Sequence, residues 1–318
     1  MPSGPGARGV GVRGIGARGV VARGVVARGD VARGDVAKIL PFSAVDGPGN
    51  RAAVFLQGCD FDCRYCHNPE TRALCVHCGL CVAGCPAGAL ASAAVNPSTE
   101  LPYGLRVSWD PTRCTGCGAC TAACTHDSSP KVMDMSVADV MSVVGRYRAF
   151  LSGITVTGGE CGLQAGFLEA LLAGSRAAGL PGLVDTNGST DYTMHPGLVE
   201  AAEGFMLDVK AWDDAEHRLL TGASNVMVKM NLRFLASARK LYEVRTVVVP
   251  GYFDAESTVR EVSRVLAAAG SGARYKLIRF RPQGVRAAWR GLPTPDDSTM
   301  DALASIARAE GAREVVVV

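Results

Sequence analysis

Residues 57–68 read QGCDFDCRYCHN and carry the most informative pattern in the chain. They hold three cysteines in the order C-x3-C-x2-C, namely Cys59, Cys63 and Cys66. Three thiolates on one loop can each bind one iron of a cubane 4Fe–4S cluster, which leaves the fourth iron without a protein ligand. An iron with an open position can bind and reduce a small molecule. A zinc site is the alternative, but such sites usually have four ligands in paired C-x2-C elements.

Eight further cysteines form two runs with the spacing C-x2-C-x2-C-x3-C, the first followed by Pro86 and the second by Thr125. In this bacterial ferredoxin pattern the first three cysteines of a run bind one cluster and the fourth binds the other. The pattern predicts two auxiliary 4Fe–4S clusters, one on Cys75, Cys78, Cys81 and Cys124, the other on Cys114, Cys117, Cys120 and Cys85. Disulfides are a poor alternative, because the cysteines are clustered at metal-like spacings. Cys161 belongs to no run and is predicted to be a small buried residue.

Composition places further limits on the function. The chain has 318 residues, a net charge of +3 and a hydrophobic fraction of 48%, and no apolar run approaches the ~18 residues of a membrane span. Six arginines within residues 1–37, each followed by glycine, recur every five residues. That period fits neither helix nor strand, so we expect a disordered tail there, with a basic docking arm as the functional alternative. The remainder is near neutral, and we expect a cytoplasmic monomer without nucleic-acid or membrane partners.

From about Ser136 onward, predicted strands and helices alternate, which implies parallel strands with right-handed crossovers. Polar or glycine residues follow nearly every strand, as in barrels whose active site is the C-terminal face. A doubly wound sheet would instead concentrate them at one switch point. We therefore predict an α/β fold, a partial six-stranded (β/α)6 TIM-like barrel from residues 38–69 and 131–318, with a ferredoxin-like two-cluster insert at 70–130. After a first strand before Cys59, strands are expected at 153–157, 182–186, 205–209, 243–249, 276–280 and 314–318. Helices are expected at 136–150, 163–178, 196–203, 213–220, 228–240, 256–269 and 296–308.

Several motifs together resemble the activating enzymes of glycyl radical enzymes. These are residues 45–51 (VDGPGNR), the cysteine loop ending in His67-Asn68-Pro69, and then GGE at 158–160, DTNG at 185–188 and DVK at 208–210. GGE alone or DTNG alone is a weak signal, but the set occurs in family order at successive strand ends. The insert narrows the resemblance to members with two extra clusters. Three segments look like the YjjW-type activase, namely residues 80–90 (LCVAGCPAGAL), 207–212 and 247–251.

The resemblance implies a radical S-adenosylmethionine oxidoreductase, with a flavodoxin or ferredoxin as electron donor. Such an enzyme cleaves S-adenosylmethionine reductively and uses the 5′-deoxyadenosyl radical to generate a glycyl radical on a partner enzyme. The implied S-adenosylmethionine contacts are Tyr65, Gly158, Gly159, Glu160, Asp185, Lys210 and Arg245. A monovalent cation is implied beside them, on Asp185, Thr186, Met206 and Asp208. The implied contacts to the partner protein are Asp46, Gly47, Pro48 and Gly49. Arg281 stands where relatives often carry a histidine near the adenine.

Two other functions stay open on the sequence alone. One is a radical S-adenosylmethionine enzyme that acts on a small molecule, which a closed pocket near residues 46–49 would favour over an open groove. The other is an electron carrier that uses only the insert, although a carrier has no need of the open-iron loop, GGE or DTNG. Radical chemistry needs no general acid or base, and none is expected. We interpret His195 and His217 as surface residues.

Overall fold

The structure is a computed structural model that describes residues 32–318, so most of the predicted tail lies outside the described residues. Residues 33–37 are an exception, because strand β1 spans Arg33–Ser43. It pairs antiparallel with β2 (Arg51–Leu56) on one side and with β5 (Met133–Ser136) on the other. Within it Val36 is fully buried. The predicted tail boundary at residue 37 was therefore wrong, because this segment gains backbone partners from a strand about 100 residues away.

The described residues form one nine-stranded sheet in the order β11-β10-β9-β8-β7-β6-β2-β1-β5. The seven strands from β2 to β11 run parallel to one another. The predicted barrel had six strands, but the terminal strand expected at 314–318 also joins the parallel series, because β11 pairs with β10. The sheet is open, with β5 and β11 as its edges. The remaining parallel strands are β6 (Gly153–Gly158), β7 (Gly182–Thr186), β8 (Gly204–Asp208), β9 (Leu241–Val248), β10 (Arg274–Arg279) and β11 (Glu314–Val317).

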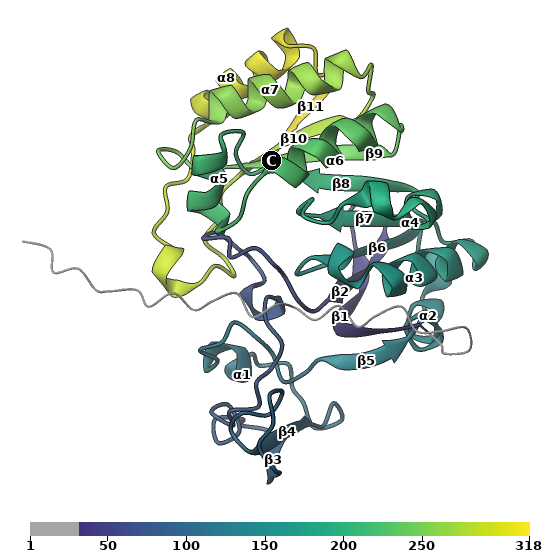
Figure 1. The fold of residues 1–318 in the computed structure, drawn as a ribbon, viewed down its shortest axis with the longest axis vertical. Coiled ribbons are helices and arrows are strands. Elements are labelled where there is room, and N and C mark those ends of the chain that lie inside the picture. The colour runs from purple at the N-terminus through teal and green to yellow at the C-terminus, as the bar shows by residue number, and fades with distance from the viewer. Residues whose placement is uncertain (1–31) are drawn as a thin grey trace, which may run out of the picture.

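Helices follow the parallel strands in turn and pack on one another in chain order, α2 on α3, α3 on α4, α6 on α7 and α7 on α8. Figure 1 shows them as a row along one side of the sheet. Ser136 caps the first with a capping box, but the helix ends at Gly145 and not near residue 150. No helix among the described residues has the length and apolar character needed to cross a membrane. The helices are α2 (Val137–Gly145), α3 (Ala165–Ala177), α4 (Pro196–Ala201), α5 (Asp214–Thr221), α6 (Val226–Ser237), α7 (Ala255–Ala268) and α8 (Asp297–Ala309).

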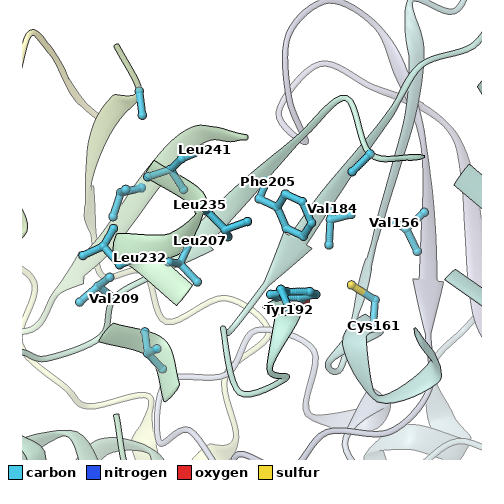
Figure 2. Packing of buried hydrophobic residues seen from close by; sticks show 14 of the residues in the cluster. Val156, Cys161, Val184, Tyr192, Phe205, Leu207, Val209, Leu232, Leu235 and Leu241 are labelled. Carbon is cyan, nitrogen blue, oxygen red and sulfur yellow. The ribbon is translucent and has the colours of Figure 1, made fainter. Parts of the chain in front are cut away.

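The main core lies between the sheet and these helices. Figure 2 shows side chains from the central strands, among them Val184 and Phe205, facing Leu232 and Leu235 of α6. Burying a side chain of this size contributes about 1.5–3 kcal/mol, so this layer holds the helices against the sheet. Cys161 belongs to the same core and is fully buried, which confirms the prediction for it.

The insert has a small sheet of its own. β3 (Leu90–Ala94) pairs antiparallel with β4 (Leu105–Trp109), and a short helix, α1 (Ala119–Ala122), follows. Figure 1 shows these elements below the main sheet, on the side away from α7 and α8. The two ends of the insert meet where the Ala73 amide donates to the Asp127 carbonyl at 3.0 Å. The insert is therefore attached to the sheet through one narrow junction.

Candidate cluster and cofactor site

The three-cysteine loop leaves the carboxyl end of β2, and its backbone is held from two sides. Gly58 begins it with a φ of 103°, a conformation that favours glycine. The amides of Gly58 and Cys59 each donate at 2.8 Å to carbonyl oxygens at the end of the turn η1 (Pro69–Thr71) and just after it. The amides of Asp62 and Arg64 donate to the last turn of α5 at 2.7 and 2.9 Å. The main chain therefore fixes the positions of the three cysteines.

The thiols of this loop are largely withdrawn from water. Cys59 and Cys63 pack against the main core, and burial raises the pKa of Cys63 to about 12 although the nearby Lys210 charge opposes it. In residues 32–318 no three Cys, His, Asp or Glu side chains converge on a single metal position. In a cubane each thiolate binds a different iron, so its ligands spread more widely than around one ion. A donor set of three partly buried sulfurs is the kind that suits an iron–sulfur cluster.

The eight cysteines of the insert line two pockets. The pockets measure about 320 and 310 Å³, and Cys120 borders both. In each, the fourth cysteine of one run lies with the first three of the other, the exchange typical of two-cluster ferredoxins. Besides the shared Cys120, the larger pocket is lined by Cys75, Cys78, Cys81 and Cys124. The four that line the smaller pocket are Cys85, Cys114, Cys117 and Cys120.

Backbone amides point at sulfurs of the larger pocket. The backbone amide of His77 donates to Cys75 Sγ, and the backbone amide of His126 donates to Cys124 Sγ, each at 3.4 Å. The Ser128 hydroxyl lies 3.5 Å from Cys124 Sγ. Hydrogen bonds of this kind stabilise negative charge on sulfur and tune iron–sulfur potentials. The pocket is therefore chemically suited to thiolates.

A network of two carboxylates and two cations lies at the ends of three neighbouring strands. Arg245 of β9 is the register partner of Asp208 at the end of β8, and its Nε donates to that carboxylate at 2.8 Å. Its Nη1 donates to Asp185 of β7 at 3.1 Å, and Nη2 binds the same carboxylate. Lys210 Nζ lies 2.9 Å from Asp208. The structure thus brings four predicted contact residues together in a charge-balanced group.

Burial governs the electrostatics of this network. It raises the pKa of Asp185 above its usual range, although Arg245 opposes the effect. Burial also acts on Asp208, but Arg245 and Lys210 together outweigh it and lower that pKa. Both cations are themselves mostly buried, with side chains only 10–13% exposed. Their charges are therefore poorly screened and are available to an anionic group of a ligand.

The other two predicted cation ligands, Thr186 and Met206, are not members of the network formed by Asp185, Asp208, Lys210 and Arg245. The Thr186 hydroxyl donates to Glu160 at 2.8 Å and accepts from the Tyr192 hydroxyl at 2.8 Å, so it belongs to another network. Met206 is the register partner of Asp185 on the adjacent strand. Because Arg245 and Lys210 already balance the two aspartates, a cation has to compete with them for these carboxylates.

Glu160 is completely buried, and both of its oxygens are engaged. Oε1 accepts from the Gly162 amide at 2.8 Å and from the Thr186 hydroxyl, and Oε2 accepts from the Asn187 amide at 2.7 Å. Burial raises its pKa to about 7 despite these donors. Tyr192 OH also lies 3.3 Å from Oε1. This carboxylate therefore joins the loop after β6 to the loop after β7, a role that the motif GGE did not reveal.

The two glycines before Glu160 allow close backbone contact with β2. A Cβ atom on Gly158 would overlap the main chain of Leu56, and one on Gly159 would overlap the carbonyl of Gly58. The Gly159 amide donates to Leu56 O at 3.0 Å, and the Glu160 amide donates to Gly58 O at 2.7 Å. The glycine pair consequently lies directly beside the start of the three-cysteine loop.

Sequence reasoning missed two amides that shape the site. Asn187 Nδ2 lies 3.7 Å from Cys59 Sγ and donates to Asp60 at 3.2 Å, which connects the DTNG turn to the cysteine loop. Asn231, on the buried face of α6, donates to the carbonyls of Gly188 and Thr190 at 2.9 and 2.6 Å. Asn187 could have been found as the third residue of DTNG. A lone polar residue on the apolar face of α6 was the only signal for Asn231.

Residues 46–49 lie at the amino end of β2, and their loop turns toward the sheet. The Thr155 hydroxyl of β6 donates to the Asp46 carbonyl at 2.5 Å. A Cβ on Gly47, which has a φ of 126°, would touch Leu183 and Arg51. The Asp46 charge is one of the causes that raise the pKa of Asp185. This loop therefore faces the same side of the sheet as the carboxylate network.

Tyr65 occupies a second apolar cluster with Phe280 and Val249. Its side chain is 4% exposed, and its hydroxyl has no hydrogen-bond partner within the described part of the chain. Lys210 Nζ lies 5.7 Å from the ring centroid. A buried hydroxyl without a partner is costly, so this position fits a site that receives a polar ligand.

Two sequence interpretations need correction or restatement. His217, interpreted as a surface residue, is fully buried and packs edge-on against Phe61 at 5.3 Å between ring centroids, so that interpretation was wrong. The reason is that α5 packs under the cysteine loop and turns this face inward. His195 is partly exposed. Arg281 has an exposed side chain, and its carbonyl lies 3.0 Å from His67 Nε2.

Comparisons with known proteins agree with this arrangement. Residues 74–128 match a family model described as a 4Fe–4S dicluster domain, and residues 45–88 match a 4Fe–4S single cluster domain. The chain is 32% identical to the isethionate sulfite-lyase activating enzyme of Oleidesulfovibrio alaskensis, over 87% of this chain and 95% of that protein. It is 28% identical, with the same coverages, to the indoleacetate decarboxylase activating enzyme of Tractidigestivibacter scatoligenes.

Solved structures resemble the chain in fold. The crystal structure of QueE from Escherichia coli has a TM-score of 0.50 at 12% identity and covers 90% of this chain and 94% of that one. SuiB of Streptococcus suis, bound to its precursor peptide SuiA, has a TM-score of 0.53 at 9% identity, over 82% of this chain and 47% of that one. At these identities the likeness concerns the fold alone.

Proposed function

The chain belongs to the glycyl radical enzyme activating enzymes, radical S-adenosylmethionine enzymes that generate a glycyl radical on a partner enzyme, and we propose that it does so with three 4Fe–4S clusters. The observation that carries the proposal is the sorting of its cysteines. Eight line two adjacent pockets of the insert, and each pocket contains all four cysteines predicted for one cluster. Cys59, Cys63 and Cys66 lie apart from them, at the end of β2. Three ligands leave one iron open for S-adenosylmethionine.

A cluster in this loop supplies the electron that cleaves S-adenosylmethionine to methionine and a 5′-deoxyadenosyl radical. The chain itself binds and orients the substrate. Lys210 and Arg245 are buried cations suited to the methionine carboxylate. The unpartnered hydroxyl of Tyr65 is available to a polar group of the substrate, and the backbone of Gly158 and Gly159 forms a wall beside the start of the cysteine loop. Glu160 then acts by holding that wall in place, since its own oxygens are already bonded.

Charge balance limits when a monovalent cation can join the site. Asp185 and Asp208 are matched by Arg245 and Lys210. When a substrate carboxylate draws on those two cations, the two aspartates are left with excess negative charge. We therefore propose that a cation binds together with S-adenosylmethionine, on the oxygens of Asp185 and Asp208.

The partner is an enzyme with a glycine-bearing loop, and we propose that residues 46–49 contact that loop. They pack against Thr155 and Leu183, and Leu183 lies on the same face of β7 as Asp185 because the two are two residues apart. A flavodoxin or ferredoxin is proposed as electron donor, with the activase acting as a monomer. The two relatives are named for different partners, a sulfite-lyase and a decarboxylase. The narrower YjjW-type assignment stays a prediction.

The test measures iron and product on anaerobically prepared protein. Three cubanes predict about twelve irons per chain. Replacing Cys59, Cys63 and Cys66 with alanine should remove about a third of the iron and all formation of 5′-deoxyadenosine. Cys161→Ser is the matched control, because that thiol is buried and no ligand role is proposed for it. Stoichiometric zinc without broad visible absorption would contradict the proposal. A glycyl radical signal on a partner enzyme, seen by electron paramagnetic resonance, separates this function from small-molecule chemistry.

A further inference from the structure

Two arginines and two aspartates form a charged cluster where three segments of the chain meet. Asp62 belongs to the three-cysteine loop, Arg72 follows that loop, Asp127 ends the insert, and Arg286 lies in the segment after β10. Asp127 Oδ2 accepts from Arg72 Nη2 at 2.9 Å and from Arg286 Nη1 at 3.1 Å. Asp62 Oδ1 lies 2.6 Å from Arg286 Nη1 and 3.7 Å from Arg72 Nε. No sequence motif pointed to this group.

Arg286 differs from Arg72 in what its side chain touches. Its Nη2 donates to the carbonyl oxygen of Cys63 at 2.8 Å, in addition to the two carboxylates. The side chain is 22% exposed, so its charge is only partly screened by water. No comparable bond from the Arg72 side chain to a cysteine carbonyl occurs in residues 32–318. The arrangement therefore holds a guanidinium, paired with two carboxylates, directly against the backbone of the ligand loop.

The segment that carries Arg286 is held against the cysteine loop at three other points. His67 Nε2 lies 3.0 Å from the carbonyl of Arg281. Gly284, with a φ of 81°, approaches so closely that an added Cβ would lie 2.6 Å from the His67 carbonyl. The Arg64 guanidinium stacks over the Trp289 ring at 4.6 Å. Arg286 consequently has little freedom to move away from Cys63.

We propose that Arg286 is a positioning residue that raises the reduction potential of the cluster held by Cys59, Cys63 and Cys66. The inference rests on the proposed function, since it needs a cluster in that loop. One electron from a one-electron carrier makes the cluster more negative by one charge, and no bond forms or breaks in that step. A guanidinium stays charged at every working pH, and a fixed cation nearby stabilises the reduced form.

The insert takes part through Asp127. This residue is three positions after Cys124, which lines the larger pocket of the insert. Its carboxylate holds both arginines, and its backbone carbonyl accepts from Ala73 at the other end of the insert. The insert therefore helps to fix the charge that faces the cysteine loop, whatever else its own clusters do.

The test is a redox titration of the intact holoprotein, followed by electron paramagnetic resonance. The signal that changes when S-adenosylmethionine is added belongs to the cluster with the open iron. For Arg286→Gln we expect the ratio of reduced to oxidised cluster at a fixed potential to fall at least tenfold, which is 59 mV for one electron. Arg286→Lys keeps the charge and should change the ratio less than threefold. Arg72→Gln, the matched control, should also change it less than threefold, because Arg72 does not touch the cysteine carbonyl.

Three outcomes would overturn the inference. One is a change below threefold for Arg286→Gln, and another is an equal change for the Lys and Gln variants, which would make the role geometric. If Arg286→Gln binds no iron, Arg286→His replaces it, because histidine loses its charge as the pH rises through about 6.5. The midpoint potential of the Arg286→His variant must then fall with rising pH more steeply than that of the unaltered protein. Equal slopes for the two proteins are the third outcome that would overturn the inference. A protein without any signal that responds to S-adenosylmethionine would instead refute the proposed function.

Discussion

Arg51 is the first residue of β2, and its side chain is only 1% exposed. Its Nε and Nη2 donate to the carbonyl of Ile154 at 3.1 and 2.8 Å. Nη2 also donates to the carbonyl of Pro181 and to the carboxylate of Glu203, both at 2.7 Å. One guanidinium thus ties β2 to β6, to the turn before β7 and to the residue that precedes β8. We expect its removal to loosen the amino end of the sheet.

The expected loss for Arg51→Ala is about 3 kcal/mol of unfolding free energy. Breaking a buried ion pair costs about 3–5 kcal/mol, and the lower end applies because the Glu203 side chain is 39% exposed and can be rehydrated. At about 2–4 °C per kcal/mol, the thermal midpoint should fall by roughly 6–12 °C. The assay is thermal unfolding followed by circular dichroism, on anaerobic protein with matched iron content.

Two further variants separate the contributions at Arg51. Glu203→Gln keeps an acceptor and removes only a partly exposed charge, so a loss below about 1 kcal/mol is expected. Arg51→Lys keeps the charge but cannot reach all three acceptors, so its loss should be intermediate. The reasoning is refuted if Arg51→Ala stays within about 1 kcal/mol of the unaltered protein, because the buried guanidinium would then contribute nothing that alanine and water cannot replace.

Three other predictions use the same measurement. A chain that begins at residue 38 should melt several degrees below one that begins at residue 32, since it lacks Val36 and the buried side chain contributes about 1.5–3 kcal/mol; equal midpoints would contradict this. Tyr192→Phe should lose about 1 kcal/mol, because its hydroxyl no longer donates to Thr186, and no change would mean that the bond is not needed. Burial lowers the pKa of His217 to about 4 from its usual 6.5. Its stabilisation is therefore complete above pH 6.5 and is lost as the pH falls toward 4, by about 3 kcal/mol. In His217→Gln the unfolding free energy should fall less steeply between pH 6.5 and pH 4. An unchanged pH dependence would contradict the assignment of this stability loss to His217.

Elements that depend on local pattern were predicted well. The strand 182–186 was placed to the residue, and Ser136 and Asp213, where two helices were expected to start, are the N-cap residues of α2 and α5. Periodicity and capping are short-range properties, so the sequence carries them directly. The first residues of β1 were missed because what makes them a strand is pairing with β5, about 100 residues away. No local pattern contains that information.

The same distinction applies to the site. The cysteine sets could be assigned from spacing, because three ligands of each set are close neighbours in the chain and the ferredoxin pattern states that the fourth comes from the other run. The surroundings of Glu160 could not be predicted, since its donors come from the loop after the next strand. Within a motif the sequence identifies which residues matter, whereas the fold decides which of their atoms stay available. That is why Glu160 was expected to bind a ligand and is found with both oxygens occupied.

The contacts that the sequence did not predict lie around the three-cysteine loop, and the reason is topological. From β2 to β11 the strands lie in the sheet in the same order as in the chain, so motifs on successive strands become neighbours in space and their grouping could be predicted. β2 ends that parallel series, and its other neighbour, β1, is antiparallel. The loop after β2 therefore has a regular neighbour on one side only. Segments from elsewhere in the chain cover the rest of it, namely α5 with His217, the end of the insert with Asp127, and the segment after β10 with Arg286. The residues that surround the candidate cluster are consequently those that strand order predicts least, and substitutions there should test the structure more sharply than changes in the motifs.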